Sequence, residues 1–310
     1  MKIVLLDAKT LDNDKRLDSL KDLGEFVSYD STPSALVYER CKDADIIVTN
    51  KVTFNAEMLK KLPKLKLIAI TATGTNIIDL EAAKEFNITV KNVAGYSTKS
   101  VAQHTLTMAL ILLSQMPYYD AYCKSGAWAK NDIFTHLSGG LGQMEGKKWG
   151  IIGMGEIGRE VARIASCMGA EVSYTSISGN VQNLPYTHLP LEDLLKQSDI
   201  ISIHSPLTPQ THNLINETNL PLLKKDALLI NSGRGGIVNE EALAKHLKEG
   251  RIYFGADVLE VEPMKEGHVF LDTSLHARLL LTPHIAWAYE NSRKVLIDKV
   301  IANIKEFLQG

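Results

Sequence analysis

The stretch that decides the fold runs from Lys148 to Gly158 and reads KWGIIGMGEIG. The residues before its first glycine are typical of a short buried strand, and the apolar residues between Arg159 and Met168 have helical spacing. A strand, a G-x-G-x-x-G turn and a helix form the phosphate-binding corner of a dinucleotide-binding fold. Because the turn stands in this context, the sequence predicts that residues 153–158 bind a nucleotide.

The three glycines have separate physical roles in such a turn. Gly153 permits the tight bend, Gly155 has no side chain to hold a pyrophosphate away from the backbone, and Gly158 lets the helix pack closely on the strand. The start of the helix, with Glu156 and Ile157, offers free N–H groups and a partial positive charge to the phosphates.

The bulk properties of the chain exclude several classes of protein. Its 310 residues are long for one simple domain and comfortable for two. The net charge is −2 with scattered basic residues, so nothing indicates a nucleic-acid partner or a membrane-surface patch. No apolar run approaches the about 18 residues that a membrane span needs, and the apolar start reaches Asp7 too soon for a signal peptide. Cys41, Cys123 and Cys167 are far apart and odd in number, which predicts reduced thiols in a cytoplasmic protein and no metal site.

Strand-like and helix-like segments alternate along the chain, which predicts an α/β fold with two doubly wound parallel sheets. Strands of the first sheet are expected at Lys2–Leu6, Glu25–Tyr29, Ala44–Val48 and Leu65–Ile70. Strands of the second sheet are expected at Trp149–Ile152, Glu171–Tyr174, Asp199–His204, Ala227–Asn231, Ile252–Asp257 and Leu279–Leu281. Helices are expected between them, for example at Pro33–Cys41 and Asn55–Leu62.

Two further segments bear on the organisation of the chain. A long apolar helix is expected at residues 98–113, followed by an irregular excursion at about 114–146. Exposed aromatic residues in it, such as Trp128 and Phe134, would suit an interface between subunits. Trp287–Gly310 is an amphipathic helix with no strand of its own. If this helix packs on the first sheet, the first domain is discontinuous.

Three side chains with complementary chemistry each follow a predicted strand of the second half, namely Arg234, Glu262 and His284. Ligands of open α/β sheets bind beyond the carboxyl ends of strands, so we expect all three at the crevice that holds the dinucleotide. An arginine fork binds a carboxylate, a histidine passes a proton to or from an oxygen, and a carboxylate beside it orients the ring. Each residue alone could be packed or solvated, but together they predict reduction of a 2-keto acid by hydride.

The order and wording of these segments resemble the D-isomer-specific 2-hydroxyacid dehydrogenases over essentially the whole chain. The segments that carry the resemblance are Asn92–Tyr96, Gly153–Gly158, His204–Thr208, Asn231–Gly236, Asp257–Pro263 and Thr282–His284. The resemblance implies two α/β domains with a cleft between them and a dimeric assembly. A flavodoxin-like substrate domain would comprise residues 1–98 and 287–310. A Rossmann-type dinucleotide-binding domain would comprise residues 99–286.

The resemblance also implies roles for individual residues. Arg234 would bind the substrate carboxylate and carbonyl, His284 would be the acid/base, and Glu262 would pair with it. Substrate contacts are implied for Asn50, Lys51, Thr73, Gly74, Arg234 and His284, with the loop from Thr73 to Asn76 offering backbone N–H groups. Asp257 matches the position that contacts the nicotinamide carboxamide. Cofactor contacts are implied for Gly153, Gly155, Glu156, Ile157, Gly158, Ser176, His204, Pro206, Thr211, Ser232, Gly233, Asp257 and Ala286.

Within the family, Asn50–Val52 and Pro283–Ala288 look most like glycerate dehydrogenases, which are also called hydroxypyruvate reductases. That likeness implies hydroxypyruvate or glyoxylate as the 2-keto acid, with D-glycerate or glycolate as the product. The alternative is a nucleotide-sensing interaction protein on the same fold, since the C-terminal-binding corepressors resemble the family and keep its catalytic residues. Against this alternative, the chain has little beyond the enzyme core.

The end of the second strand of the nucleotide-binding sheet departs from the usual pattern. NAD-binding folds place Asp or Glu there to bind the ribose hydroxyls, but this position falls on Ser176. No carboxylate would repel a 2′-phosphate, and no Arg or Lys follows in residues 177–180 to attract one. The sequence therefore predicts NAD or NADP as the cofactor, with NAD slightly favoured on family grounds.

Overall fold

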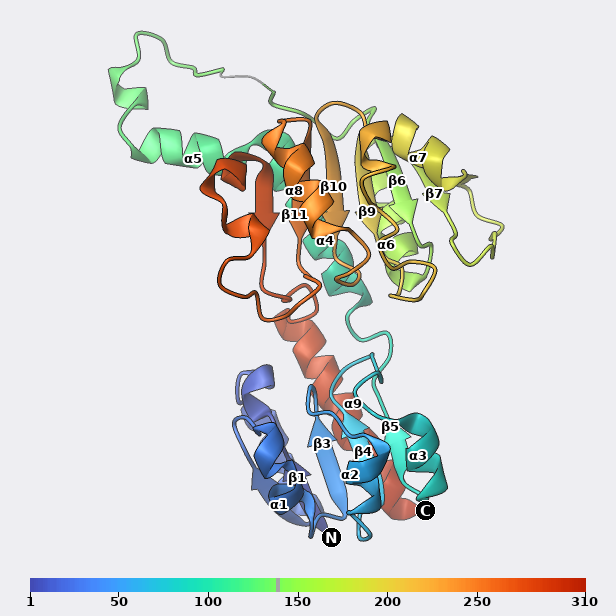
Figure 1. Cartoon of the computed structure of the whole chain (residues 1–310). Coiled ribbons are helices and arrows are strands. Elements are labelled where there is room, and N and C mark those ends of the chain that lie inside the picture. The colour runs from blue at the N-terminus through green and yellow to red at the C-terminus, as the bar shows by residue number, and fades with distance from the viewer. Residues whose placement is uncertain (138–139) are drawn as a thin grey trace. The chain divides into compact units, whose positions relative to one another are not determined.

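The computed structural model describes residues 1–137 and 140–310 and divides the chain into two compact units. Unit 1 comprises Met1–Ser97 and Ala288–Gly310, and unit 2 comprises Thr98–Trp287. Each unit is built around one sheet of parallel strands with helices packed against it (Figure 1). The predicted fold class, two doubly wound parallel sheets, is therefore confirmed.

Unit 1 has a five-stranded sheet in the order β2-β1-β3-β4-β5, which is the flavodoxin-like order. Its strands are β1 (Lys2–Leu5), β2 (Glu25–Ser28), β3 (Ile46–Thr49), β4 (Leu67–Ile70) and β5 (Thr89–Lys91). Its helices are α1 (Val37–Cys41), α2 (Ala56–Lys60), α3 (Leu80–Glu85) and α9 (Glu290–Gln309). β5 was not predicted, because a three-residue edge strand with one apolar side chain leaves almost no periodic signal in the sequence.

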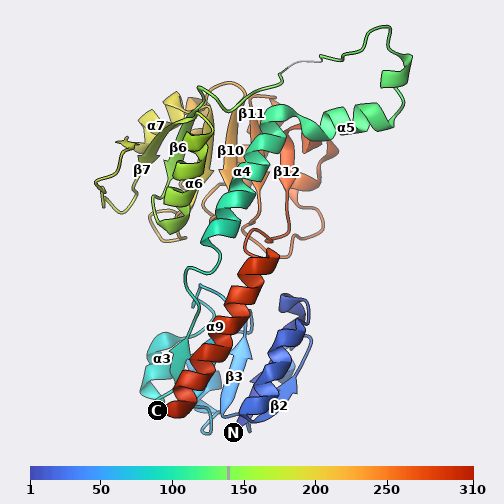
Figure 2. The same ribbon diagram turned by 180° about the vertical axis from the view of Figure 1, so that it is seen from behind.

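The sheet of unit 1 buries apolar side chains on both of its faces. Val4, Ile47 and Ile68 form one cluster with apolar residues of α1, α2 and α3. α9 contacts β4 and the 3-10 helix Lys15–Leu23 (Figure 2), and it buries a stripe of four apolar residues, Leu296, Ile297, Val300 and Ile304. The last helix of the chain therefore completes the unit that the first residues begin.

Unit 2 has a seven-stranded sheet in the order β12-β11-β10-β9-β6-β7-β8. Counted from β6, this is the Rossmann order 3-2-1-4-5-6 with one further strand at the edge. Its strands are β6 (Lys148–Ile152), β7 (Glu171–Thr175), β8 (Thr187–His188), β9 (Ile200–Ile203), β10 (Ala227–Asn231), β11 (Ile252–Ala256) and β12 (Leu279–Leu281). Its helices are α4 (Thr98–Ser114), α5 (Met116–Lys124), α6 (Glu156–Cys167), α7 (Leu191–Gln197) and α8 (Glu240–Lys248). The two-residue strand β8 was not predicted, for the same reason as β5.

Successive side chains of a strand point to opposite faces, and the strands of unit 2 are apolar on both. Ile151 and Leu228 pack with α4 and α6 on one face, whereas Ile152 and Leu229 pack with α7 and α8 on the other. Figure 2 shows α4 lying across β10 and β11. This helix therefore runs past the strands whose ends carry the candidate catalytic residues.

The two ends of the excursion after α4 lie side by side, because Gly142 N–H donates to the Leu113 carbonyl at 3.0 Å. The expectation that all of it is irregular was wrong, since it contains α5. Pro117 in the first turn of α5 favours a helix start, but no residue of α5 is buried, so its sequence lacks the apolar period that identifies helices. Ser138 and Gly139, which fall within the predicted excursion, lie outside the described residues.

Candidate active site

The glycine turn joins β6 to α6 and is tight at two of its three glycines. Gly153 has a φ of +95°, and a Cβ atom there would lie 2.5 Å from Ser205 Oγ. A Cβ atom on Gly158 would lie 2.3 Å from the Gly153 carbonyl oxygen, so α6 packs directly on the turn. A Cβ atom on Gly155 would meet nothing within 4 Å. The turn is thus closed toward the protein and open at Gly155.

The open side of the turn coincides with the start of α6. Gly155 is the N-cap of this 12-residue helix, which begins at Glu156 and Ile157. The first N–H groups of a helix have no partner within it, and the helix dipole adds a partial positive charge. A phosphate group that approached the bare Gly155 backbone would meet both, so this end of α6 fits the pyrophosphate of a dinucleotide.

His204, which follows β9, adds a second observation that fits a bound cofactor. Ser202 Oγ accepts a hydrogen bond from Trp149 Nε1 at 2.9 Å and lies 3.0 Å from His204 Nε2. Burial lowers the pKa of His204 to about 3, so the ring is neutral at pH 7. Its Nδ1 atom is buried and has no hydrogen-bond partner among the residues that the structure describes. Buried polar atoms are normally paired, so Nδ1 fits a contact with a ligand.

Thr211 was predicted to contact the cofactor, but its hydroxyl is engaged inside the turn that follows His204. Its Oγ1 donates to the Pro206 carbonyl at 2.7 Å and accepts from Thr208 N–H at 2.7 Å. Thr211 is buried, whereas Pro206 is exposed at the tip of the turn. The structure therefore gives Thr211 the task of shaping the turn that presents Pro206.

Ser176 follows β7, as predicted, and its Oγ lies 3.3 Å from Ser178 Oγ. The sequence analysis did not assign a cation to this region. Arg159, the residue after Gly158, donates to the Met154 carbonyl at 3.4 Å and to Gln182 Oε1 at 3.0 Å. Its guanidinium thus lies against the glycine turn. Its position directly after the third glycine could have identified it. In the sequence, however, Arg159 was considered only as the start of the helical pattern.

Arg234 lies in a loop after β10 that Asn231 holds in place. Asn231 Nδ2 donates to the Arg234 carbonyl at 2.8 Å, and Asn231 Oδ1 accepts from Gly233 N–H at 3.1 Å. The Arg234 side chain is exposed and donates to the Gly233 carbonyl at 2.8 Å. Among the described residues it forms no salt bridge. Its charge is therefore available to an anionic ligand. The adjacent Ser232, predicted to contact the cofactor, is buried.

The loop of Arg234 touches the loop of Glu262 through a glycine. A Cβ atom on Gly235 would lie 1.8 Å from the Leu259 carbonyl oxygen, so any larger residue would force the two loops apart. Leu259 N–H donates to Glu262 Oε1 at 3.0 Å, which fixes one oxygen of that carboxylate. The structure therefore brings the Arg234 and Glu262 loops into contact.

Glu262 and His284 form a direct pair, because Glu262 Oε2 lies 2.7 Å from His284 Nδ1. A carboxylate can only accept, so Nδ1 carries the hydrogen and Nε2 faces away from the pair. The backbone of His284 has a φ of +54°, which is uncommon for a residue other than glycine. Such a conformation persists only where the surroundings impose it, and such sites are often functional.

Asp257 imposes that conformation. Its carbonyl accepts from His284 N–H at 2.8 Å. Its buried carboxylate accepts from Ile285 N–H at 2.8 Å and from Ala286 N–H at 2.9 Å. Three consecutive N–H groups thus bond to one residue. Asp257 and Ala286 were both predicted to contact the cofactor, and the hydrogen bond between them was not predicted.

The candidate substrate residues of unit 1 lie in two loops that follow β3 and β4. Asn50 and Lys51 donate their N–H groups to the buried carboxylate of Asp7, at 2.9 and 2.8 Å to Oδ2. Thr73 Oγ1 donates to the Val93 carbonyl at 3.0 Å, and Gly74 follows it. The sequence analysis treated Asp7 only as the end of an apolar run, so it missed this anchor.

Comparisons with known proteins now identify the family. Residues 106–286 match the family described as D-isomer specific 2-hydroxyacid dehydrogenase, NAD binding domain. A putative 2-hydroxyacid dehydrogenase of Haemophilus influenzae is 39% identical, over 100% of this chain and 98% of its own. Glycerate dehydrogenase of Methylorubrum extorquens is 37% identical, over 100% of this chain and 96% of its own.

A solved structure agrees with these relatives. It is an NADPH-dependent glyoxylate/hydroxypyruvate reductase from Sinorhizobium meliloti in complex with NADP and malonate, with a TM-score of 0.84 and 26% identity. The match covers 99% of this chain and 93% of that one. None of the described helices is long and apolar enough to span a membrane. As the sequence analysis predicted, the chain belongs to the D-isomer-specific 2-hydroxyacid dehydrogenase family and is an NAD(P)-dependent oxidoreductase.

Proposed function

We propose that the enzyme reduces a small 2-keto acid to the D-2-hydroxy acid, with hydroxypyruvate or glyoxylate as its preferred substrate. The observation that carries the proposal is the 2.7 Å contact between Glu262 and His284. The Glu262 loop also touches the loop of Arg234, whose guanidinium forms no salt bridge among the described residues. The names of the relatives support the substrate class. They speak against a nucleotide-sensing interaction protein, because each is a dehydrogenase or a reductase.

The protein's own residues supply the proton and the substrate anchor. Glu262 holds Nδ1 of His284, which leaves Nε2 to deliver a proton to the substrate carbonyl oxygen. The carboxylate also stabilises the charged ring from which that proton departs. Arg234 offers a planar fork that can hold the substrate carboxylate through two parallel hydrogen bonds. When bound, the reduced nicotinamide supplies the hydride for the carbonyl carbon.

The residues for the cofactor follow from the geometry of unit 2. The N–H groups at the start of α6, reached past Gly155, would hold the pyrophosphate. His204 Nδ1 offers an unpaired polar atom, and Ser176 offers a hydroxyl for the ribose end. We propose contacts with the same cofactor for Gly153, Glu156, Ile157, Gly158, Pro206, Ser232, Gly233, Asp257 and Ala286. Thr211 would act through the turn that it shapes.

In unit 1 we propose that Asn50, Lys51, Thr73 and Gly74 bind the substrate. The support is chemical, since the Lys51 side chain carries positive charge and the loop of Thr73 and Gly74 contributes backbone N–H groups. Substrates of this class are small carboxylates, which such groups recognise.

A spectrophotometric screen tests the proposal directly. Oxidation of NADH and of NADPH is followed over a range of concentrations of hydroxypyruvate, glyoxylate, pyruvate and longer 2-keto acids. The proposal expects the highest kcat/KM for hydroxypyruvate or glyoxylate. A preference for a branched or long 2-keto acid would contradict the substrate assignment, and oxidation of neither cofactor with any acid would contradict the activity.

Glu262→Gln separates the pairing of Glu262 from its bulk. An amide has one oxygen, so it cannot accept from both Leu259 N–H and His284 Nδ1–H as the carboxylate does. We expect kcat to fall by at least about tenfold with little change in the melting temperature. Glu260→Gln, an exposed change in the same loop, is the matched control and keeps wild-type turnover. Equal turnover of the two variants would remove Glu262 from the mechanism.

Gly155→Ala tests the phosphate site without disturbing the fold. The new methyl group meets no protein atom within 4 Å, and the φ of −75° suits alanine. Stability should therefore be unchanged or slightly higher. The methyl group stands where the pyrophosphate would approach, so NADH binding measured by fluorescence titration should weaken at least about tenfold, which is about 1.4 kcal/mol. Wild-type affinity in this variant would place the pyrophosphate elsewhere.

Ser176 predicts weak discrimination between the two cofactors. A serine hydroxyl can bond to a ribose hydroxyl or to a 2′-phosphate but repels neither. We expect the kcat/KM values for NADH and NADPH to differ by no more than about tenfold, or about 1.4 kcal/mol. Ser176→Asp should penalise NADPH by adding a repulsive charge. A thousandfold preference in the wild-type enzyme would mean that another residue, for which Arg159 is the first candidate, makes the choice.

We further propose a cytoplasmic homodimer whose subunits meet at the excursion after α4. Phe134 and Leu137 are 87% and 76% exposed there, although Trp128 Nε1 ties the Phe134 carbonyl into the segment. Exposed apolar residues gathered on one segment are typical of an interface. The three cysteines are unpaired thiols, which suits a reducing compartment.

Phe134→Asp tests the assembly, because a carboxylate at the centre of an apolar interface loses its water. Sedimentation velocity should show a dimer for the wild type and a shift toward monomer for the variant. Val295→Asp, an exposed apolar position on α9, serves as the control and should stay dimeric. A monomeric wild-type protein would refute the assembly.

A further inference from the structure

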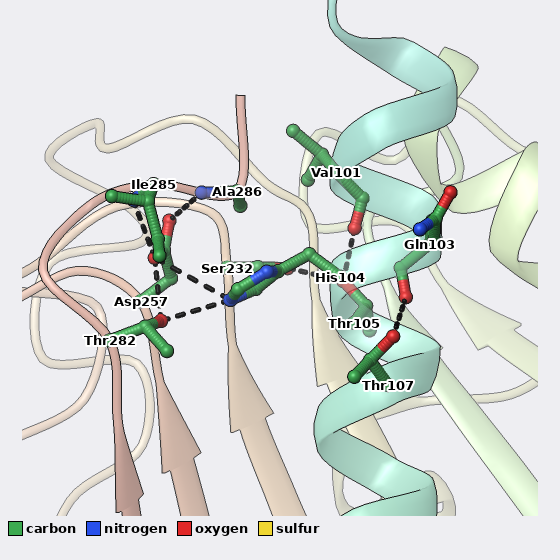
Figure 3. A network of polar contacts seen from close by, with 10 residues as sticks. All are labelled: Val101, Gln103, His104, Thr105, Thr107, Ser232, Asp257, Thr282, Ile285 and Ala286. Carbon is green, nitrogen blue, oxygen red and sulfur yellow. Dashed lines mark hydrogen bonds and ion pairs between the residues drawn. The ribbon is translucent and has the colours of Figure 1, made fainter. Parts of the chain in front are cut away.

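The inner side of α4 carries two polar residues that the proposed chemistry does not use. His104 and Thr105 are 5% and 0% exposed, in a helix that buries mainly apolar side chains and packs against β10 and β11. Each reaches a residue at the end of a strand of the nucleotide-binding sheet. Thr105 Oγ1 lies 2.7 Å from Ser232 Oγ, and His104 Nε2 lies 2.9 Å from Thr282 Oγ1 (Figure 3).

Counting protons fixes the direction of the hydrogen bonds around Thr282. A hydroxyl has one proton, and Thr282 Oγ1 donates it to Asp257 Oδ1 at 2.7 Å. The same oxygen can therefore only accept from His104, so Nε2 of His104 carries a hydrogen. The chain of donation runs from His104 through Thr282 to Asp257, and Nε2 also lies 3.6 Å from Asp257 Oδ1.

The far end of this chain is the residue that shapes the loop of His284. The carboxylate of Asp257 accepts from Ile285 and Ala286 N–H, and its carbonyl accepts from His284 N–H. A carboxylate can rotate about its bonds unless its oxygens are occupied by fixed donors. Oδ1 is held from two sides, by Ile285 N–H and by the Thr282 hydroxyl that His104 orients.

We propose that His104 is a positioning residue for the proposed reduction: by donating to Thr282 it fixes the Asp257 carboxylate, and thereby the loop that carries His284. The inference rests on the proposed role of His284 as proton donor. Burial lowers the pKa of His104, while the charge of Asp257 opposes that effect. A ring with hydrogen on Nε2 can make the donation to Thr282 that this chain requires.

The decisive variants remove or keep the donor. His104→Leu deletes it, and His104→Gln keeps an N–H close to the position of Nε2. We expect kcat of His104→Leu to fall about tenfold, with the KM for the 2-keto acid changed by less than about twofold. The reason is that a displaced proton donor stabilises the transition state less and leaves substrate binding unchanged. His104→Gln should recover most of that loss. A loss shared equally by both variants would assign His104 a packing role only.

A double-mutant cycle tests whether the two residues act in one chain. Thr282→Val removes the hydroxyl at constant shape, so the double variant should be no worse than the worse single variant. Additive losses would contradict the chain. Thr107→Val is the matched control, since Thr107 is exposed and its hydroxyl donates to the Gln103 carbonyl of the same helix. If His104→Leu does not fold, Thr282→Val repeats the test, with Thr282→Ser, which keeps the hydroxyl, as its control.

Amide hydrogen exchange gives a readout that needs no turnover. In the enzyme with NADH, Ile285 and Ala286 N–H groups should exchange at least about fivefold faster in Thr282→Val and His104→Leu than in the wild type or Thr107→Val. Unchanged exchange would overturn the inference even if the activity stands. If the wild-type enzyme reduces no 2-keto acid, the proposed function fails, and the exchange rates still decide whether His104 holds the loop.

Discussion

The loop of unit 2 that carries His284 depends on one residue, Asp257, which directly follows β11. Its carbonyl accepts from His284 N–H, and its carboxylate accepts from Ile285 and Ala286 N–H, so three consecutive N–H groups after β12 are held in place. A buried N–H without a partner costs about 1–3 kcal/mol, and a non-glycine residue in a left-handed conformation adds a cost of its own. The hydrogen bonds to Asp257 therefore stabilise the turn at His284 and offset the cost of its left-handed backbone conformation. The His284 side chain then points Nδ1 at Glu262, so this half-buried histidine is oriented through a loop that the buried Asp257 holds.

Unit 1 solves the same problem with Asp7. Parallel strands end with backbone N–H groups that no neighbouring strand pairs, and a loop that must present N–H groups or side chains to a ligand cannot also pair them all. Asp7, just past β1, accepts from Asn50 and Lys51 after the neighbouring β3, as Asp257 accepts from the loop after the neighbouring β12. In both units a buried acid at one strand end fixes the loop at the next.

This division of labour explains what could be predicted from the sequence. The positions of most strands, the glycine turn and the choice of Arg234, Glu262 and His284 as candidates were accessible because strands are periodic and polar residues that follow strand ends stand out in the sequence. His104 was not, since one histidine in an apolar helix looks like a packed residue and its partner Thr282 is 178 positions away. The role of Asp7 was not predicted either, because its partners Asn50 and Lys51 are distant in sequence. Thr211 was predicted as a cofactor contact, although its hydroxyl closes a turn. Local sequence patterns therefore identify candidate reactive residues, and rarely the residues that position them through contacts distant in sequence.

The holding groups also explain why glycine is required where no ligand is involved. Gly235 brings the Arg234 loop within contact of the Leu259 carbonyl, and Leu259 N–H then fixes Glu262. Without that close approach, the contact that fixes the position of the Arg234 loop relative to the loop of Glu262 would be lost. With it, the charge that would hold the substrate carboxylate and the ring that would deliver the proton are tied to one set of strand ends. The positions of the candidate catalytic side chains are therefore set by contacts of the backbone loops that carry them.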